Sequence, residues 1–174
     1  KWEHYLKFYL LQIKKIILIW DFKMIKSKLL SNYKNISHGF FNKLGGYSSG
    51  IYKSLNCGIG SKDKKININK NLKKVCKKIK CDKTKLILLN QIHSNKVINI
   101  INIPKKKPIG DALITSKSKY ALAVLTADCA PIFIFDSNQK IISVIHAGWK
   151  GAYKKIIYKT IYELKKRGSN IENL

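Results

Sequence analysis

The chain has 174 residues, 45% of them hydrophobic, and carries 35 basic against 9 acidic residues, a formal net charge of +26 at pH 7. This length suits one domain with a buried core. It holds no secretory signal that we recognise and no run near the roughly 20 apolar residues that would cross a bilayer, so we expect no membrane partner.

The positive charge is almost entirely lysine, because Arg167 is the only arginine in the sequence. Base readout and bidentate phosphate recognition both favour arginine. Lysine is accompanied here by abundant isoleucine and asparagine, which share AT-rich codons with it. We therefore favour a solvated lysine surface, and keep a lysine-rich nucleic-acid-binding module as an alternative that a steep salt dependence of binding would reveal.

The cysteines do not form a recognisable disulfide or zinc-ribbon pattern. Their spacing is irregular and their number small, which fits a reduced, cytoplasmic compartment. They are Cys57, Cys76, Cys81 and Cys129.

Residues 1–23 differ from the rest, since the chain starts with lysine and its single methionine is Met24. We expect these residues to be a non-native or poorly ordered extension and the domain to occupy residues 24–174. The alternative is an amphipathic helix, because Leu6, Leu10, Ile13 and Ile17 recur at helical spacing.

A glycine-rich loop follows an aromatic pair in the first part of the domain. Gly45 and Gly46 can turn backbone N–H groups toward an anion, with Lys43 supplying positive charge. The same residues also suit an ordinary turn. Next, residues 67–80 read as an amphipathic helix with an apolar stripe and a lysine and asparagine face.

The second half predicts strands separated by short turns, then a helix. Residues 132–135 and 141–145 should pair as a hairpin through the loop at 136–140, and a single helix is expected over 152–166. Interleaved strands and helices indicate an α+β fold with a mixed sheet. The other expected strands cover residues 86–90, 96–101 and 110–115.

Three apolar runs are followed by residues that bind transition metals. His93 follows the run at 86–89, Cys129 follows the run at 120–125, and His146 ends the run at 141–145. Singly, each has a structural explanation, as a core cysteine or a hydrogen-bonded histidine. Together, two imidazoles and one thiolate suit a single Zn²⁺ with its fourth position open, as in catalytic zinc sites. The rival interpretation is a metal-free hydrolase in which the Cys129 thiolate, paired with His146, attacks an amide or ester.

Several short motifs carry a family resemblance, in order, from residue 37 to 174. They are Gly-Gly-Tyr-Ser-Ser-Gly at 45–50, Ser-Leu-Asn at 54–56, Gln-Ile-His at 91–93, Asp-Ala-Leu-Ile-Thr at 111–115, Thr-Ala-Asp-Cys at 126–129 and His-Ala-Gly-Trp at 146–149. With these motifs the chain resembles the laccase-domain or polyphenol oxidase family, whose members are described as zinc-dependent purine nucleoside phosphorylases with adenosine deaminase side activity. The resemblance implies a layered αββα sandwich with His93, Cys129 and His146 as zinc ligands.

The resemblance also implies substrates and a reaction. Adenosine, inosine or S-methyl-5′-thioadenosine would be cleaved by inorganic phosphate, held near the zinc, Lys43, Lys150 and the Gly45 and Gly46 amides. The general acid that protonates the leaving purine is unassigned, with Asp111 and Asp128 as candidates beside purely structural roles. Deamination would use a zinc-activated water at the same site.

Three features qualify what the resemblance implies. The family carries arginine where Lys43 and Lys150 stand, so we expect weaker phosphate binding. Its members continue several dozen residues beyond Leu174, so we expect the C-terminal part of the domain to be missing. Four histidines in all cannot ligate a multicopper centre, although one copper ion could occupy the zinc site. The oligomeric state stays open.

Overall fold

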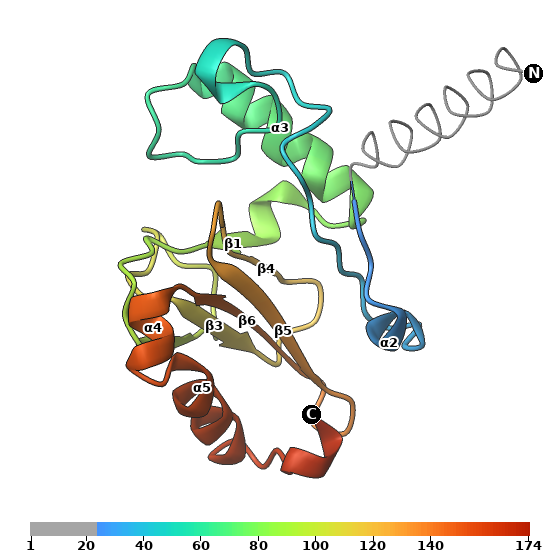
Figure 1. Cartoon of the computed structure of the whole chain (residues 1–174). Helices are drawn as coiled ribbons and strands as arrows, with labels where there is room; N and C mark the ends of the chain where they lie inside the picture. Colours follow the sequence, from blue (N-terminus) through green and yellow to red (C-terminus); the bar gives the residue numbers. More distant parts are fainter. Residues whose placement is uncertain (1–23) are drawn as a thin grey trace, which may run out of the picture. The chain divides into compact units, whose positions relative to one another are not determined.

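The computed structural model describes residues 24–174 and divides the chain into two compact units, Lys1–Lys80 and Cys81–Leu174 (Figure 1). The expected N-terminal extension, residues 1–23, lies outside the described residues.

The first unit is organised by one amphipathic helix. Helix α3 spans Lys65–Lys78 and buries Ile68, Leu72 and Cys76 at helical spacing, which confirms the expected helix with its bounds shifted by two residues. The unit also holds the short helix α2 (Lys28–Ser31) and a 3₁₀ turn at Gly50–Tyr52.

Asn71 is an exception to the expected lysine and asparagine face of α3, because its side chain is fully buried. Its Oδ1 accepts a hydrogen bond from Tyr47 N at 2.8 Å, and its Nδ2 donates to Ser48 Oγ at 2.9 Å and Asn56 O at 2.7 Å. A buried amide with these partners satisfies polar backbone that the glycine-rich loop would otherwise bury unpaired. Asn71 thus ties that loop to the helix.

The second unit is built on two sheets. Strands β1 and β4 form a parallel pair, and the remaining strands form a mixed four-stranded sheet in the order β2-β3-β6-β5. The strands are β1 (Leu86–Leu88), β2 (Val97–Asn99), β3 (Ala112–Thr115), β4 (Ala121–Ala123), β5 (Ala130–Asp136) and β6 (Ile141–Ala147); 3₁₀ turns cover Lys83–Lys85 and Ile171–Asn173.

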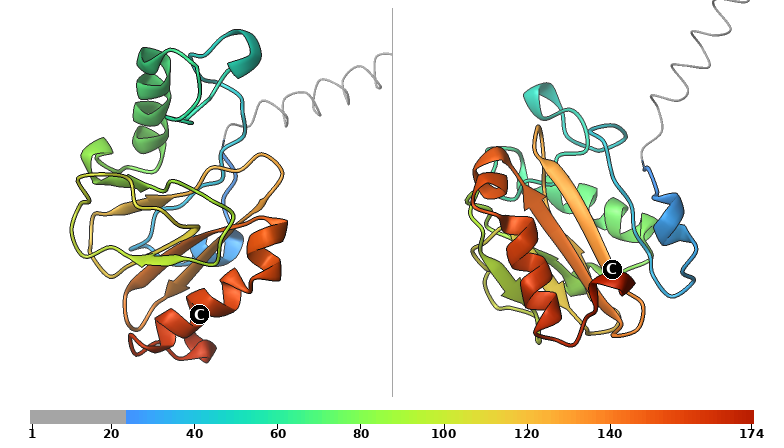
Figure 2. Two further views of the ribbon diagram at one scale, coloured as in Figure 1. Left: turned by 90° about the vertical axis from the view of Figure 1, so that its left-hand side faces the viewer. Right: turned by 60° about the horizontal axis from the view of Figure 1, so that its bottom comes forward.

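The four-stranded sheet is covered on both faces. On one face Leu113 and Val144 pack with Ile87 and Leu122 of the two-stranded sheet. On the other, Ile145 packs against Ile156 of helix α5 (Ile156–Lys165), which Figure 2 shows lying along the sheet. The unit therefore stacks a sheet, a second sheet and a helical layer, and these apolar contacts are the main source of its stability.

The predicted hairpin is confirmed, and the predicted C-terminal helix is broken in two. Strands β5 and β6 pair in antiparallel register, with Ile132 opposite Ile145. Helix α4 spans Trp149–Tyr153, and α5 begins only at Ile156. Lys155 separates them in a left-handed conformation (φ 61°) that cannot continue a helix.

The fold class is therefore confirmed as α+β with mixed sheets. The second helical layer of the expected αββα sandwich stays an expectation of the resemblance. Among residues 24–174, no helix is both long and apolar enough to span a bilayer.

Candidate metal centre

Strand topology brings the His93 and Cys129 loops to one edge of the second unit. Strands β1 and β4 run parallel, with Leu88 beside Ala123, so the chain leaves both strands at the same edge. His93 lies in the loop after β1, and Cys129 ends the loop that follows β4. The sequence suggested that Cys129 directly follows a strand. In the structure β4 already ends at Ala123, and Cys129 immediately precedes β5.

Gln91 fastens these two loops together, a role that sequence reasoning did not assign. Its Nε2 donates to Leu125 O at 2.7 Å, and its Oε1 accepts from Leu125 N at 2.8 Å. The side-chain amide thus makes the same pair of hydrogen bonds to Leu125 that the backbone of a neighbouring strand would make.

The β5–β6 hairpin places the third residue of the group. His146 lies near the end of β6, opposite Pro131 at the start of β5, and Cys129 is two residues before Pro131. Proline is tolerated here because β5 is the edge strand of its sheet. Residues from three distant parts of the chain therefore meet at one point.

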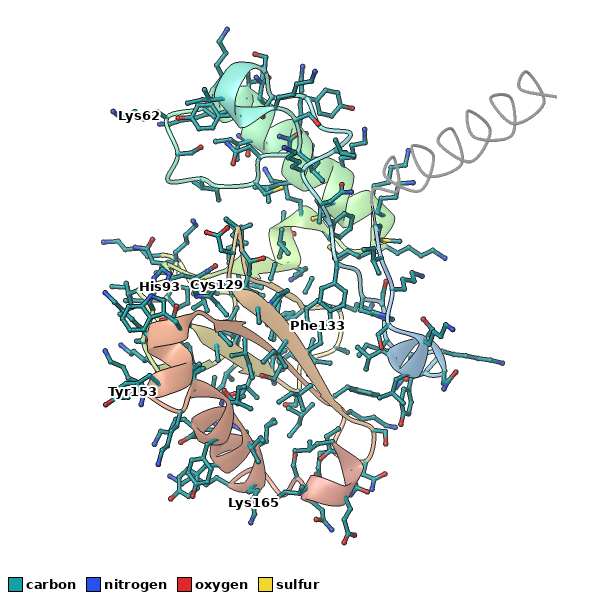
Figure 3. All side chains as sticks on the ribbon, viewed as in Figure 1. Lys62, His93, Cys129, Phe133, Tyr153 and Lys165 are labelled. Atoms are coloured by element: carbon teal, nitrogen blue, oxygen red, sulfur yellow. The ribbon has the colours of Figure 1, made fainter. Side chains whose placement is uncertain are left out.

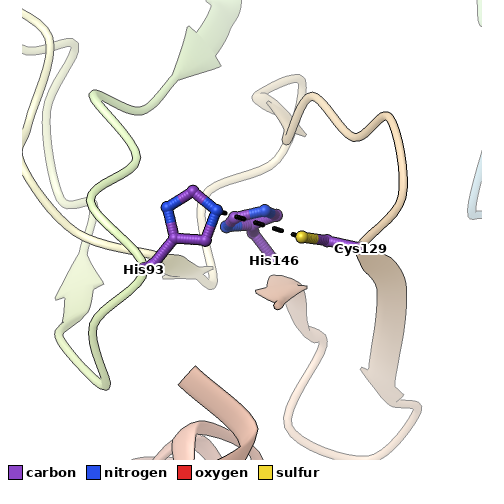
Figure 4. A group of neighbouring side chains, drawn as sticks. All are labelled: His93, Cys129 and His146. Carbon is purple, nitrogen blue, oxygen red and sulfur yellow. Dashed lines mark hydrogen bonds between the residues drawn. The ribbon is translucent and has the colours of Figure 1, made fainter. Parts of the chain in front are cut away.

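The predicted group of His93, Cys129 and His146 is close enough to share an ion, since one donor atom from each lies within 4.8 Å of the others (Figure 4). Figure 3 shows His93 and Cys129 on the ribbon of the chain. Cys129 Sγ lies 4.0 Å from His93 Nε2. The imidazole rings of His93 and His146 meet edge to face, with centroids 4.8 Å apart. His146 is buried, Cys129 is half-buried and His93 is exposed, so the group opens to solvent on one side.

This donor set fits zinc. Zn–N bonds of about 2.0–2.1 Å and Zn–S bonds of about 2.3 Å put tetrahedral neighbours roughly 3.3–3.6 Å apart. The Cys129–His93 separation of 4.0 Å exceeds that range by only a few tenths of an ångström. Three protein donors leave one position for a water molecule or a substrate atom.

Asp111 lies behind the group, fully buried immediately before β3. Its Oδ1 accepts hydrogen bonds from His146 Nδ1 at 2.9 Å and His93 N at 3.0 Å. Burial would raise the pKa of Asp111, but hydrogen bonds from Ser94, His146 and the backbone outweigh it and hold this pKa below its ordinary value. Asp111 is therefore an ionised carboxylate that accepts hydrogen bonds, and with Nδ1 of His146 donating to it, His146 Nε2 is left free for a ligand.

The backbone of Gly148 packs directly against the group. A Cβ at this position would lie 2.8 Å from Cys129 Sγ and 2.9 Å from His93 Cδ2. Both distances are shorter than real Cβ contacts, so any other residue here would have to displace the Cys129 and His93 side chains.

Of the remaining predicted site residues, Lys150 and Asp128 belong to the same unit as this group, and neither is hydrogen-bonded to it. Lys150 is exposed on α4, where its Nζ lies 5.4 Å from the ring centroid of Trp149, and Asp128 is exposed in the loop before Cys129. Lys43, Gly45 and Gly46 belong to the first unit. There the Gly46 N–H donates to Ser54 Oγ at 3.0 Å.

The fold and the donor group define an α+β protein with a candidate three-ligand transition-metal site. Residues 37–174 match the family model described as multi-copper polyphenol oxidoreductase laccase, and the chain belongs to this family. The match spans parts of both units.

Curated relatives of the chain are named purine nucleoside phosphorylases. The protein of Bacteroides thetaiotaomicron is 30% identical over 84% of this chain and 57% of its own length. The protein of Bacillus subtilis, YlmD, is 30% identical over 80% of this chain and 54% of its own length. The chain thus spans about half the length of the curated relatives it matches.

A solved structure shares the fold. The Bacillus licheniformis hypothetical protein YfiH superposes with a TM-score of 0.77 at 25% identity, covering 85% of this chain and 58% of that one.

Proposed function

We propose that the protein is a zinc-dependent purine nucleoside phosphorylase, which cleaves the N-glycosidic bond of adenosine, inosine or S-methyl-5′-thioadenosine with inorganic phosphate. The observation that carries this proposal is the convergence of His93, Cys129 and His146 in a chain whose curated relatives bear that name.

His93, Cys129 and His146 would hold the zinc ion, with His146 binding through Nε2 because Asp111 occupies Nδ1. When bound, zinc would supply Lewis-acid chemistry, polarising an oxygen atom of phosphate or of water. A single copper ion could occupy the same donors. The four histidines of the sequence are too few for the multicopper centre that the family description names.

Phosphate would be held by positive charge and by backbone amides. Lys150 follows His146 by four residues in the second unit, and we propose that its ammonium faces the anion. Lys43, Gly45 and Gly46 are proposed as further phosphate contacts from the family resemblance alone. Lysines hold phosphate as point charges rather than as bidentate forks, so binding should be weaker than with arginine.

Asp128 is a better candidate than Asp111 for the general acid that protonates the leaving purine. The Asp111 carboxylate is fully buried and already accepts hydrogen bonds from several donors. Asp128 is exposed beside Cys129 and is free to approach a bound base. Adenosine deamination, as a side activity, would take place at the same zinc site, with water in place of phosphate.

The alternative, a metal-free hydrolase, rests on a Cys–His contact. The contact seen is Cys129 Sγ to His93 Nε2 at 4.0 Å, rather than the Cys129–His146 pair that the sequence suggested. Such a nucleophile would work without metal. Zinc analysis after dialysis separates the two functions, because only the phosphorylase requires a stoichiometric ion.

The deciding experiment is release of free base from adenosine and inosine by the 174-residue chain, with and without phosphate. We expect phosphate-dependent release, and loss of at least about a hundredfold in His93→Ala, which removes a zinc ligand. His38→Ala is the matched control, because His38 lies in the first unit and accepts a hydrogen bond from Ser27 N. Equal rates in His93→Ala and the unsubstituted chain would contradict the proposal.

A further inference from the structure

The carboxylate of Asp111 collects hydrogen bonds from two segments that carry metal donors. Besides His146 Nδ1 and His93 N on Oδ1, its Oδ2 accepts from Ser94 N and from Ser94 Oγ, each at 2.7 Å, and from Ile92 N at 3.4 Å. Five donors therefore converge on one fully buried side chain. Three of them are consecutive backbone N–H groups of the His93 loop.

The backbone at His93 is unusual and depends on this arrangement. His93 has φ 55°, a left-handed conformation that costs a non-glycine residue free energy. Consecutive N–H groups that point to one side form a concave nest for an anion. In this chain the anion is internal, and the nest closes around the Asp111 carboxylate.

We infer that Asp111 is the positioning residue of the metal centre, which fixes both histidine donors at once: it holds the His93 loop in its left-handed turn and sets the His146 tautomer. This inference rests on the zinc site of the proposed function. It does not depend on which reaction the zinc site performs.

The substitution Asp111→Asn tests this role sharply, because asparagine has one acceptor oxygen where aspartate has two. If the new NH₂ group faces Ser94, it meets the Ser94 N–H and the loop must move. If it faces His146, Nδ1 must become the acceptor, and the proton moves to Nε2, the atom that should bind metal. Either orientation disturbs one donor.

The measurement is zinc affinity by competition with a chromophoric chelator, with cobalt(II) absorption as a spectroscopic readout of the coordination geometry. We expect Asp111→Asn to bind zinc 10–100-fold more weakly and its cobalt spectrum to change. A second variant, Ser94→Ala, removes one donor from the same carboxylate and should weaken zinc binding by a smaller factor while the chain stays folded.

Asp136→Asn is the matched control. Asp136 is also fully buried in the second unit, and its Oδ1 accepts from Asn138 N and Gln139 N at 2.8 and 3.0 Å. We expect this variant to have a lower melting temperature but the same zinc affinity as the unsubstituted chain.

The outcomes separate this inference from the proposed function. Asp111→Asn with unchanged zinc affinity and cobalt spectrum would overturn the inference alone, as would equal losses in Asp111→Asn and Asp136→Asn. A chain that binds no zinc at all would overturn the metal centre and the inference together. Zinc binding that responds to Asp111→Asn without phosphate-dependent base release would leave the inference standing and reject the phosphorylase.

Discussion

At the scale of single residues, the candidate centre is limited by space as much as by donors. Gly148 has an ordinary negative φ of −75°, so its backbone alone would accept any residue. Its neighbours do not, because a Cβ would lie only 2.8 Å from Cys129 Sγ and 2.9 Å from His93 Cδ2. A side chain here would therefore displace two of the three proposed ligand residues.

Gly148→Ala should weaken zinc binding without altering any ligand. The added methyl group would push Cys129 and His93 apart, and we expect a loss on the order of tenfold or more, as when other groups that position ligands are removed. Gly60→Ala is the control, since a Cβ there meets nothing within 4 Å. Equal zinc affinity in both variants, measured by calorimetry, would show that the site tolerates the displacement.

Cys57 and Cys129 should be alkylated at different rates, and zinc should slow the alkylation of Cys129. Burial raises the pKa of the Cys57 thiol to about 11, so little thiolate forms at pH 8 and alkylation should be slow. Cys129 is half-buried within the donor group, and bound zinc should protect it from iodoacetamide. Peptide mass spectrometry checks both expectations; alkylation of Cys129 at one rate with and without zinc would argue against its role as a ligand.

At the scale of elements, the break between α4 and α5 is local and costs stability. Lys155 is held in the left-handed region, and Asn95 Nδ2 donates to Lys154 O at 2.8 Å across the break. The side chain of a neighbouring loop thus satisfies a carbonyl that a continuous helix would have used.

Lys155→Gly should stabilise the chain by about 0.5–1 kcal/mol, because glycine adopts the left-handed conformation without steric cost. Lys159→Gly, at an exposed position inside α5, should destabilise it by about 1 kcal/mol. Urea unfolding of both variants gives the comparison. A destabilised Lys155→Gly would mean that the break is not strained.

The same elements show how much of the structure could be predicted from sequence. Apolar periodicity located α3 and the β5–β6 hairpin, because burial dictates those patterns directly. It could not show the break at Lys155, since lysine is a good helix former and no local signal opposes a longer helix. Nor does composition reveal that Asn71, unlike other asparagines of the polar face, finds buried partners.

The candidate site was predictable in part for a similar reason. His93, Cys129 and His146 stood out because metal chemistry restricts the residue types. The hydrogen bonds between Gln91 and Leu125 and the five donors around Asp111 depend on contacts between segments distant in the sequence, which the order of residues does not reveal. The sequence had also placed Cys129 directly after a strand, whereas it precedes β5.

At the scale of the whole molecule, acid should destabilise the fold. Burial would raise the pKa of Asp136, but hydrogen bonds that include those from Gln139 and Asn138 hold this pKa below its ordinary value. The pKa of Asp63 is lowered likewise, first by a hydrogen bond from Ser48. Carboxyls with depressed folded-state pKa values stabilise the fold above their unfolded value of about 4, and this contribution is lost as the pH falls below it.

We therefore expect the melting temperature to be steady from pH 7 to about 5 and to fall below about pH 4. The fall should be shallower in Asp136→Asn, which cannot titrate at that position. The large positive charge of the chain adds repulsion in the same direction. Calorimetric scans across this range check the sign, and a melting temperature that rises on acidification would contradict it.

X-ray absorption at the zinc edge of the chain loaded with one equivalent of zinc would show whether His93, Cys129 and His146 bind one ion together. We predict two nitrogen scatterers at about 2.0–2.1 Å and one sulfur at about 2.3 Å, with the sulfur lost in Cys129→Ser. A spectrum without sulfur in the unsubstituted chain, or one that Cys129→Ser leaves unchanged, would contradict the account.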